Sequence, residues 1–568
     1  MLALLASAAV LWAAGGCRPN KNPANGSPDD SLPGESRTEN TPGGAPSEGS
    51  LPGDSSPESR PPEGSDPSTV SPGGSSSGDS TSGGTPPDTP APSTPSSDPP
   101  SSQITLEVLN NGIETGGTVL RAKTDIRHQT VESFGVSGAW WSTGIGDRAS
   151  MDEILPLLFT DRGIALNTYR HNIGGGRESG PLNDSGTAPD SWRAVPCPLA
   201  ADGRIDITAD TNGWTVLQKI MALGTVDNVV LFMNSPPSGM TVNGKTYNPA
   251  SGSNLRPACY NQYAVFCADV AEAYGKAGIP VKYISPINEP QWQWSDGWQE
   301  GCHYTTEEAL RLTRLVVAEL NRRKLPVKVS VNESAEYRSS SYTYQFYESL
   351  LSDNTLYPYI DHFAVHGYSA DAPIRSDLFA WTRSAAGRLG KTALPMYQSE
   401  YAAWKADTNL SAAERLTMTA RALHEDLTLL NVPSWDYFAA VARGSDALIV
   451  VNDNRPEYYA LTRHFWVIGN YSKFIKGYTR VEVEGTGLPE GVMGSAYLAP
   501  DGKKLVFVAV NDTAADKTVT LAGIPAGSRG EVYETSMQRT CETAKGVMLA
   551  DNGYVLPAQS VTTFVFPL

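Results

Sequence analysis

Two stretches of this sequence share one pattern: NVVLFMNSPP, residues 228–237, and VKYISPINEP, residues 281–290. Each begins as a short apolar run, which is typical of a buried strand, and turns polar where the run ends. Between them, residues 258–276 have the apolar spacing of a helix. A strand, a helix and a second strand in this order predict two parallel strands joined by a crossover helix.

The same unit occurs eight times, which is the count of a (β/α)8 TIM barrel. The predicted strands are 132–138, 164–169, 228–233, 281–285, 327–331, 362–365, 394–398 and 434–440. The helices that follow them are predicted at 149–160, 213–223, 258–276, 305–324, 339–353, 375–388, 411–430 and 456–473. We therefore expect an α/β fold whose catalytic barrel covers residues 126–477.

Residues 478–568 show strand patterns alone, without helix-like spacing, and this predicts an all-β sandwich. Residues 104–125 also alternate like strands around a turn, but they have no helix of their own. We expect these N-terminal strands to join the C-terminal sandwich.

The first 14 residues, MLALLASAAVLWAA, are apolar or small. As a helix they would reach about 21 Å, less than a hydrocarbon core of ~30 Å, so they indicate a signal peptide rather than a membrane span. The following Gly-Gly-Cys resembles a bacterial lipobox, in which Cys17 would carry the lipid. We therefore expect residues 1–17 to be a signal segment and the protein to be exported, as a lipoprotein of the bacterial outer membrane or cell surface.

Residues 18–103 contain 52 Pro, Gly or Ser among 86 positions and no Phe, Trp or Tyr. Such a composition cannot bury a core, so this tract is predicted to be a disordered linker. It would act as a tether between a lipid at Cys17 and the folded part of the chain.

The formal net charge of the chain is -17, and there is no run of basic residues. Because nucleic-acid binding depends on neutralising phosphates, this balance argues against a nucleic-acid partner. Six Cys in 568 residues do not form a disulfide framework, and no Cys/His spacing is typical of a metal site. We expect a monomer without metal or cofactor, which contacts the membrane only through its lipid.

Polar side chains follow the predicted barrel strands where each strand ends. In barrels of this class the chemistry lies at the C-terminal ends of the strands, so these side chains are expected to meet on one face. They are Arg170, Asn234, Asn288, Glu289, Glu333, His366, Tyr368 and Glu400.

Glu289 and Glu400 follow the fourth and seventh strands, which lie across a barrel from each other. Two carboxyl groups about 5 Å apart are what a retaining glycosidase needs, one as acid/base and one as nucleophile. Tryptophans near the same strand ends offer flat apolar surfaces on which sugar rings can stack. The substrate-binding candidates among them are Trp141, Trp292, Trp294 and Trp435.

Around the two glutamates the motifs SPINEP (285–290) and QSEY (398–401) resemble glycoside hydrolase clan A. FGVSGAWW (134–141), TYRHNIGGG (168–176), NSPP (234–237) and HGY (366–368) resemble family 30 of that clan. NSPPSGMT (234–241), SNLRP (253–257), INEPQWQW (287–294) and QEGC (299–302) are most similar to its endo-β-1,6-galactanase-like branch.

The resemblance implies a retaining enzyme with Glu289 as acid/base and Glu400 as nucleophile, held by Arg170 and Tyr368. Asn288 would bind the 2-hydroxyl of the sugar, and His366 would line the site. The chain departs from the family at the end of strand 8, where Tyr437-Phe438-Ala439 replaces Tyr-Trp-Gln. We expect nearby Trp435 to compensate for the missing indole.

The sequence leaves other activities open. The same family includes β-glucosidase or glucosylceramidase-like enzymes, β-xylosidases and xylanases, and any of these could replace the galactanase. A carbohydrate-binding protein built on an inactive hydrolase is a further alternative, but loss of one glutamate would mark it, and both are present.

Overall fold

The computed structural model describes residues 106–568, except 249–251, 339–340, 369 and 405–408. The predicted signal segment, Cys17 and the 18–103 tract lie outside the described residues. Among the helices that are described, none combines the length and apolar composition needed to cross a membrane.

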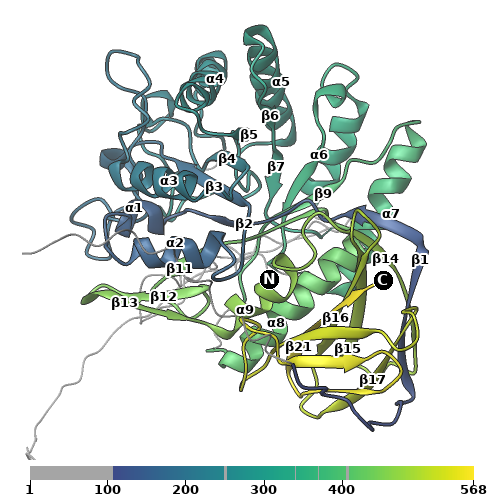
Figure 1. Cartoon of the computed structure of the whole chain (residues 1–568). Helices are drawn as coiled ribbons and strands as arrows, with labels where there is room; N and C mark the ends of the chain where they lie inside the picture. The colour runs from purple at the N-terminus through teal and green to yellow at the C-terminus, as the bar shows by residue number, and fades with distance from the viewer. Residues whose placement is uncertain (1–105, 249–251, 339–340, 369, 405–408) are drawn as a thin grey trace, which may run out of the picture. The chain divides into compact units, whose positions relative to one another are not determined.

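Parallel strands form a closed barrel at the centre of the catalytic part (Figure 1). In sequence they are β2 (Ser133–Ser137), β3 (Thr168–Ile173), β4 (Asn228–Met233), β5 (Val281–Ser285), β6 (Lys328–Val329), β7 (Val331–Ser334), β8 (Phe363–His366), β9 (Met396–Glu400) and β10 (Ser434–Tyr437). β6 pairs with β5 and β7 pairs with β8, while only Ser330 separates β6 from β7. These two segments are therefore one barrel position, which gives eight and confirms the predicted TIM barrel.

Helices connect these strands. They are α1 (Trp141–Ile145), α2 (Met151–Phe159), α3 (Thr211–Leu223), α4 (Tyr260–Lys276), α5 (Thr306–Arg323), α6 (Ser341–Ser352), α7 (Ala372–Arg388), α8 (Ala412–Glu425) and α9 (Arg463–Ser472). Short 3-10 turns lie at Arg177–Ser179, Ser238–Met240, Pro257–Cys259 and Tyr357–Tyr359, and a π turn, Asp426–Leu430, extends α8. The N-termini of α5 and α8 carry capping boxes, formed by Thr305 with Glu308 and by Ser411 with Glu414. These side chains accept from backbone N–H groups that have no partner within the helix.

The helix predicted at 456–473 is wrong in its first part. Residues Arg455–Leu461 form β13, which pairs antiparallel with β12 (Ile449–Asn452) next to β11 (Val441–Ala442). Helix α9 starts only after Thr462, whose side chain accepts from the N–H of Phe465. The pairing across the short turn outweighs the helical spacing of the segment.

The second strand lies four residues later than predicted, at Thr168–Ile173 instead of 164–169. The N–H groups of Ile164 and Leu166 donate to the carbonyls of Leu157 and Leu158, so this segment closes the end of α2. Arg170 therefore lies within β3, inside the barrel, rather than at its end.

The C-terminal part is the predicted β-sandwich. Its strands are β14 (Thr479–Thr486), β15 (Val492–Leu498), β16 (Lys504–Asn511), β17 (Lys517–Ala522), β18 (Arg529–Thr535), β19 (Gly546–Leu549), β20 (Tyr554–Leu556) and β21 (Ser560–Pro567). β1 (Thr118–Thr130) pairs antiparallel with β14 and parallel with β17 (Figure 1), which confirms that an N-terminal strand joins the sandwich. β19 and β20 have only four and three residues, which is too short for an alternating pattern to predict a strand.

The sandwich is joined to the barrel through α9. The side-chain amide of Asn470 donates to the carbonyl of Tyr533 and to Oγ1 of Thr563, at 3.1 and 2.9 Å. On the neighbouring helix, Arg421 forms an ion pair with Asp512. The sandwich thus contacts two barrel helices, α8 and α9.

Candidate active site

Arg170 is the charged centre of the barrel interior. Its side chain is fully buried, and its guanidinium lies 4.2 Å from the centre of the Phe232 ring. Nη1 donates to Oε2 of Glu400 at 2.9 Å, and Nη2 lies 3.4 Å from Oε2 of Glu333. A buried cation of this kind is stable only when paired, so Arg170 requires ionised carboxylates around it.

Glu400 is the last residue of β9, and both of its carboxylate oxygens are bound. Oε2 accepts from Arg170, and Oε1 accepts from Oη of Tyr368 at 2.6 Å. These two donors orient the carboxylate from opposite ends. The group is thereby fixed as an anion that faces the space above the barrel.

Glu289 follows β5 by four residues and has a left-handed backbone, with φ of +43°. Its N–H donates to the carbonyl of Glu333 at 2.9 Å, which holds this turn in place. Its Oε1 lies 2.8 Å from Nδ1 of His366. Burial raises the pKa of Glu289 and the charge of Glu400 adds to this, although His366 and Arg170 oppose it. Glu289 is therefore suited to hold a proton.

The two carboxyl groups lie close together. One oxygen of Glu289, one oxygen of Glu400 and one nitrogen of His366 lie within 4.8 Å of one another. Retaining glycosidases have carboxyl groups about 5–5.5 Å apart, whereas inverting enzymes need about 6.5–9.5 Å to admit a water. The separation is that of the retaining arrangement.

The same three residues offer a set of atoms that could reach a metal ion, and no other such group occurs among the described residues. All three already have partners in the protein, because Glu400 binds Arg170 and Tyr368 while Glu289 and His366 bind each other. The absence of a metal stays a prediction, and activity measured in the presence of a chelator tests it.

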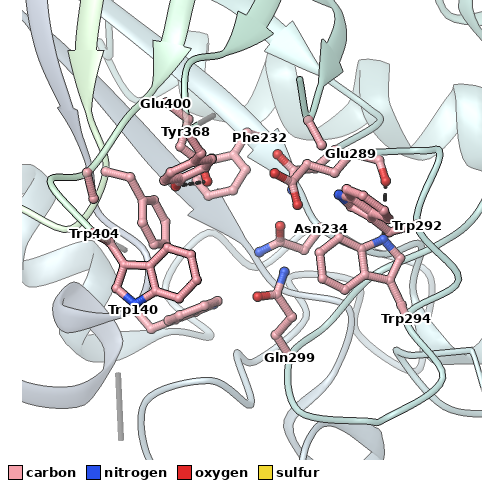
Figure 2. Close-up of a pocket in the computed structure, with 14 residues that line it drawn as sticks. Trp140, Phe232, Asn234, Glu289, Trp292, Trp294, Gln299, Tyr368, Glu400 and Trp404 are labelled. Atoms are coloured by element: carbon pink, nitrogen blue, oxygen red, sulfur yellow. Dashed lines mark hydrogen bonds between the residues drawn. The ribbon is translucent and has the colours of Figure 1, made fainter. Parts of the chain in front are cut away.

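A cleft opens above the two glutamates. Figure 2 shows Trp140 and Trp404 along one side and Trp292 and Trp294 along the other, with two amide side chains between them. The lining consists of Trp140, Phe232, Asn234, Asn288, Glu289, Trp292, Trp294, Gln299, Ala335, Tyr368, Glu400, Ala402, Trp404 and Phe438. Aromatic sides with polar groups between them can bind both the flat face and the hydroxyls of a sugar.

Most of the predicted site residues meet at this cleft. Both glutamates line it, as do five of the predicted substrate-binding residues, namely Asn234, Asn288, Tyr368, Trp292 and Trp294. Arg170 and His366 are fully buried beneath it, where they contact the two glutamates rather than the open space. Nη2 of Arg170 also donates to Oδ1 of Asn288 at 3.3 Å, which leaves the Asn288 amide nitrogen for a ligand.

Two predicted substrate-binding tryptophans do not line the cleft. Trp141 is fully buried, and its Nε1 donates to the carbonyl of Ser137 at 2.8 Å. Trp435 is also buried, and its Nε1 donates to Oδ2 of Asp426 at 2.9 Å. Trp141 packs against Tyr169, and Trp435 packs against Tyr401 and Tyr437. The expectation that Trp435 compensates for the changed residues at the end of the eighth barrel strand, β10, is therefore wrong.

Phe438 directly follows β10, the eighth position of the barrel, and it lines the cleft with its ring centre 5.6 Å from that of Trp140. Trp404 and Gln299 also line the cleft and were missed as candidates. Signals for both were present, because Trp404 follows Glu400 by four residues and Gln299 begins the QEGC motif.

A glycine makes room for one aromatic side of the cleft. A Cβ added to Gly301 would lie 2.3 Å from the Trp294 indole, which is closer than atoms can approach. Trp294 can lie against the chain at this point only because residue 301 has no side chain. The QEGC motif therefore supplies both Gln299 and the space for the Trp294 ring.

We expect Trp404→Ala to raise KM about tenfold, the equivalent of ~1.4 kcal/mol of lost ring contact, with little change in thermal stability. The matched variant Trp435→Phe should lower the melting temperature, because it breaks the bond to Asp426, and leave KM unchanged. Steady-state kinetics and thermal unfolding distinguish the two. A larger KM effect at Trp435 than at Trp404 would contradict the placement of both rings.

A closed parallel barrel with two adjacent buried glutamates beneath an aromatic cleft defines the class of this protein as a retaining glycoside hydrolase. Residues 118–450 match the model of O-glycosyl hydrolase family 30, and residues 477–564 match the family 30 β-sandwich domain. The chain belongs to glycoside hydrolase family 30.

Individual relatives agree with this family. An endo-β-1,6-galactanase of Hypocrea rufa is 26% identical over 442 residues, which cover 73% of this chain and 86% of that protein. The structure of a conserved exported protein from Bacteroides fragilis is 25% identical with a TM-score of 0.70, and the match covers 79% of this chain and all of the other. A family 30 subfamily 8 xylanase from Clostridium acetobutylicum is 21% identical with a TM-score of 0.58 over the same shares, and shows the fold alone.

Proposed function

We propose that this protein is an endo-β-1,6-galactanase that cleaves β-1,6-linked galactan internally. The observation that carries the proposal is the cleft side formed by Trp292, Trp294 and Gln299. These residues belong to the INEPQWQW and QEGC motifs, which resemble the galactanase branch, and the Hypocrea rufa relative has that activity by name. The motifs that suggest the substrate thus supply the surface that would contact it.

In the proposed reaction, Glu400 attacks the anomeric carbon while Glu289 donates its proton to the leaving oxygen. The glycosidic bond breaks, and a glycosyl ester forms on Glu400. Glu289, now ionised, then takes a proton from water, which attacks the same carbon and releases Glu400. Two inversions retain the β configuration of the product.

The two sides of the cleft would bind different parts of the chain. Glu289 must reach the leaving oxygen, so the leaving part of the substrate would lie on its side of the cleft, with Trp292 and Trp294 (Figure 2). The sugar that is transferred to Glu400 would then lie toward Trp140, Trp404 and Phe438. An aromatic surface on both sides of the glutamates suits a polysaccharide cut within its chain.

Product analysis on a panel of β-1,6-galactan, xylan and aryl β-glucosides tests this proposal. We expect oligosaccharides early in the digestion of galactan, and NMR of the first product should show the β anomer. Efficient cleavage of xylan or aryl β-glucosides without cleavage of galactan would overturn the substrate and leave the family unaffected. Initial release of the α anomer would contradict the retaining reaction.

We further propose that the chain is exported and anchored through a lipid on Cys17, with the 18–103 tract as a tether. The Ala-Gly-Gly-Cys end of the apolar leader supports this, as does the exported relative from Bacteroides fragilis. Cys17→Ser should abolish partitioning of the protein into the detergent phase while the enzyme stays active. Partitioning of the serine variant with membranes would exclude this anchor.

A further inference from the structure

A third glutamate lies directly beneath the catalytic pair. Glu333 is in β7, its side chain is 1% exposed, and four donors surround its carboxyl group. Ser330 Oγ donates to Oε1 at 2.9 Å, and Ser399 Oγ donates to Oε2. His366 Nε2 and Arg170 Nη2 lie 3.3 and 3.4 Å from Oε2. A carboxyl group that only accepts hydrogen bonds is ionised.

The electrostatics agree with this geometry. Burial by itself would raise the pKa of Glu333, but Arg170, His366 and the Ser399 hydroxyl together hold it well below its usual range. The geometry and the lowered pKa both favour the ionised form of Glu333. It contacts no part of the open cleft, so the reaction itself does not use it.

His366 lies between this anion and the acid/base. Nε2 faces Glu333 and therefore carries a hydrogen, while Nδ1 lies 2.8 Å from Oε1 of Glu289. Nε2 also lies 3.7 Å from Glu400, and the Tyr368 ring lies edge-on with its centre 6.3 Å away. Burial would lower the pKa of His366, but Glu400 and the bonds to Glu289 and Glu333 raise it to about 10.

The charges of Arg170, His366, Glu289, Glu333 and Glu400 sum to zero in both halves of the proposed reaction. With Glu289 protonated, the cations Arg170 and His366 face the anions Glu333 and Glu400. When Glu400 is esterified, ionised Glu289 replaces its charge and the sum is zero again. Without Glu333, each of these states would carry one uncompensated positive charge in the buried interior, which is costly.

Two further groups complete the surroundings of Glu333. Asp436 of β10 is buried near Arg170 and Glu333. Burial raises its pKa to about 7, Arg170 opposes the rise, and Glu333 adds to it. On the other side, Ser330 Oγ lies 3.0 Å from Nε2 of His362, whose Nδ1 lies 2.8 Å from Asp361. Since Ser330 gives its proton to Glu333, it accepts from His362, and this chain fixes the position of the anion.

We propose that Glu333 is a positioning residue that keeps His366 doubly protonated, and that it thereby sets the pH range in which Glu289 alternates between acid and base. The proposal rests on the assignment of Glu289 made above. It does not depend on the identity of the sugar.

The first test needs no substrate and follows the titration in the unaltered chain, so its failure is distinguishable from failure of the proposed activity. Histidine labelled with 15N is observed by NMR during a pH titration of the whole protein, and a His366→Gln spectrum serves only to assign the signal. We expect both nitrogens of His366 to remain protonated beyond pH 8. A His366 signal that titrates near pH 6.5 overturns the proposal.

The second test removes the charge and keeps the shape, with Glu333→Gln. Because loss of a nearby anion favours release of a proton, we expect His366 to lose its proton at least one pH unit lower than in the unaltered protein. The alkaline limb of kcat/KM, which reports the free enzyme, should move in the same direction by about one unit. The substrate is the one that the panel identifies.

Ser330→Ala is the matched control, because it removes one hydrogen bond to Glu333 and leaves the charge in place. Its alkaline limb should stay within a few tenths of a pH unit of the original position. If Glu333→Gln lowers kcat equally at every pH and neither the limb nor the His366 titration moves, Glu333 is only structural and the proposal is overturned. If that variant does not fold, the titration of the unaltered protein decides.

Discussion

Glu400→Ala should lower kcat on any natural substrate by roughly four to six orders of magnitude, the scale seen when a covalent nucleophile is removed. The reason is geometric: Arg170 and Tyr368 hold the Glu400 carboxylate at the cleft, while Glu289, which also lines it, is bound to His366. A discontinuous assay in which the released sugar is labelled and quantified can measure a loss in kcat of this size. Glu457→Ala, on the exposed strand β13, is the control and should keep full activity.

Sodium azide should restore turnover to Glu400→Ala and should produce the α-glycosyl azide. Loss of the carboxylate leaves room for a small anion on the face from which Glu400 is proposed to attack, and a single displacement there inverts the configuration. The product is identified by NMR. Formation of the β-glycosyl azide by this variant would mean that Glu400 is not the nucleophile.

Glu289→Ala should show a loss that depends on the leaving group. Removal of a general acid costs about 10²- to 10⁴-fold where the leaving oxygen needs a proton, which is the case for natural glycosides. Aryl glycosides with acidic phenols need little protonation, so their bond cleavage should be much less impaired. Pre-steady-state kinetics with a series of phenols measures this dependence as a slope against leaving-group pKa.

The azide product also distinguishes the roles of the two glutamates. In Glu289→Ala the ester on Glu400 still forms, and azide can attack it without a general base. The product should then be the β-glycosyl azide, the opposite anomer from that of Glu400→Ala. An equal loss for every leaving group, without any azide product, would contradict an acid/base role for Glu289.

Much of the fold could be predicted because the barrel strands are buried on both faces. Such strands are mainly apolar, and β4 and β5 have the bounds predicted for them, 228–233 and 281–285. The polar residues that follow them include Asn234 and Glu289, because the carboxyl end of a barrel strand is where the chain meets the open face. The same reasoning located Glu400 at the end of β9.

The predictions failed where contacts with distant parts of the chain decide between two local patterns. Residues 456–461 have helical spacing, yet they form β13 because β12 offers a strand to pair with. Trp140 and Trp141 are neighbours in sequence, but only Trp140 reaches the cleft, while Trp141 bonds to Ser137 behind it. A motif names the residue types of a site, and it does not say which of two adjacent rings faces the ligand.

The barrel, the sandwich and the two glutamates could be predicted from the sequence, because periodicity and motif are properties of consecutive residues. Which charged side chains are neighbours depends on the packing of the strands. Glu333 had no distinguishing motif, and its role appears only when β3, β7, β8 and β9 bring Arg170, His366 and Ser399 around it. Buried charges must be balanced by neighbours in space, and those neighbours come from strands that are far apart in the chain.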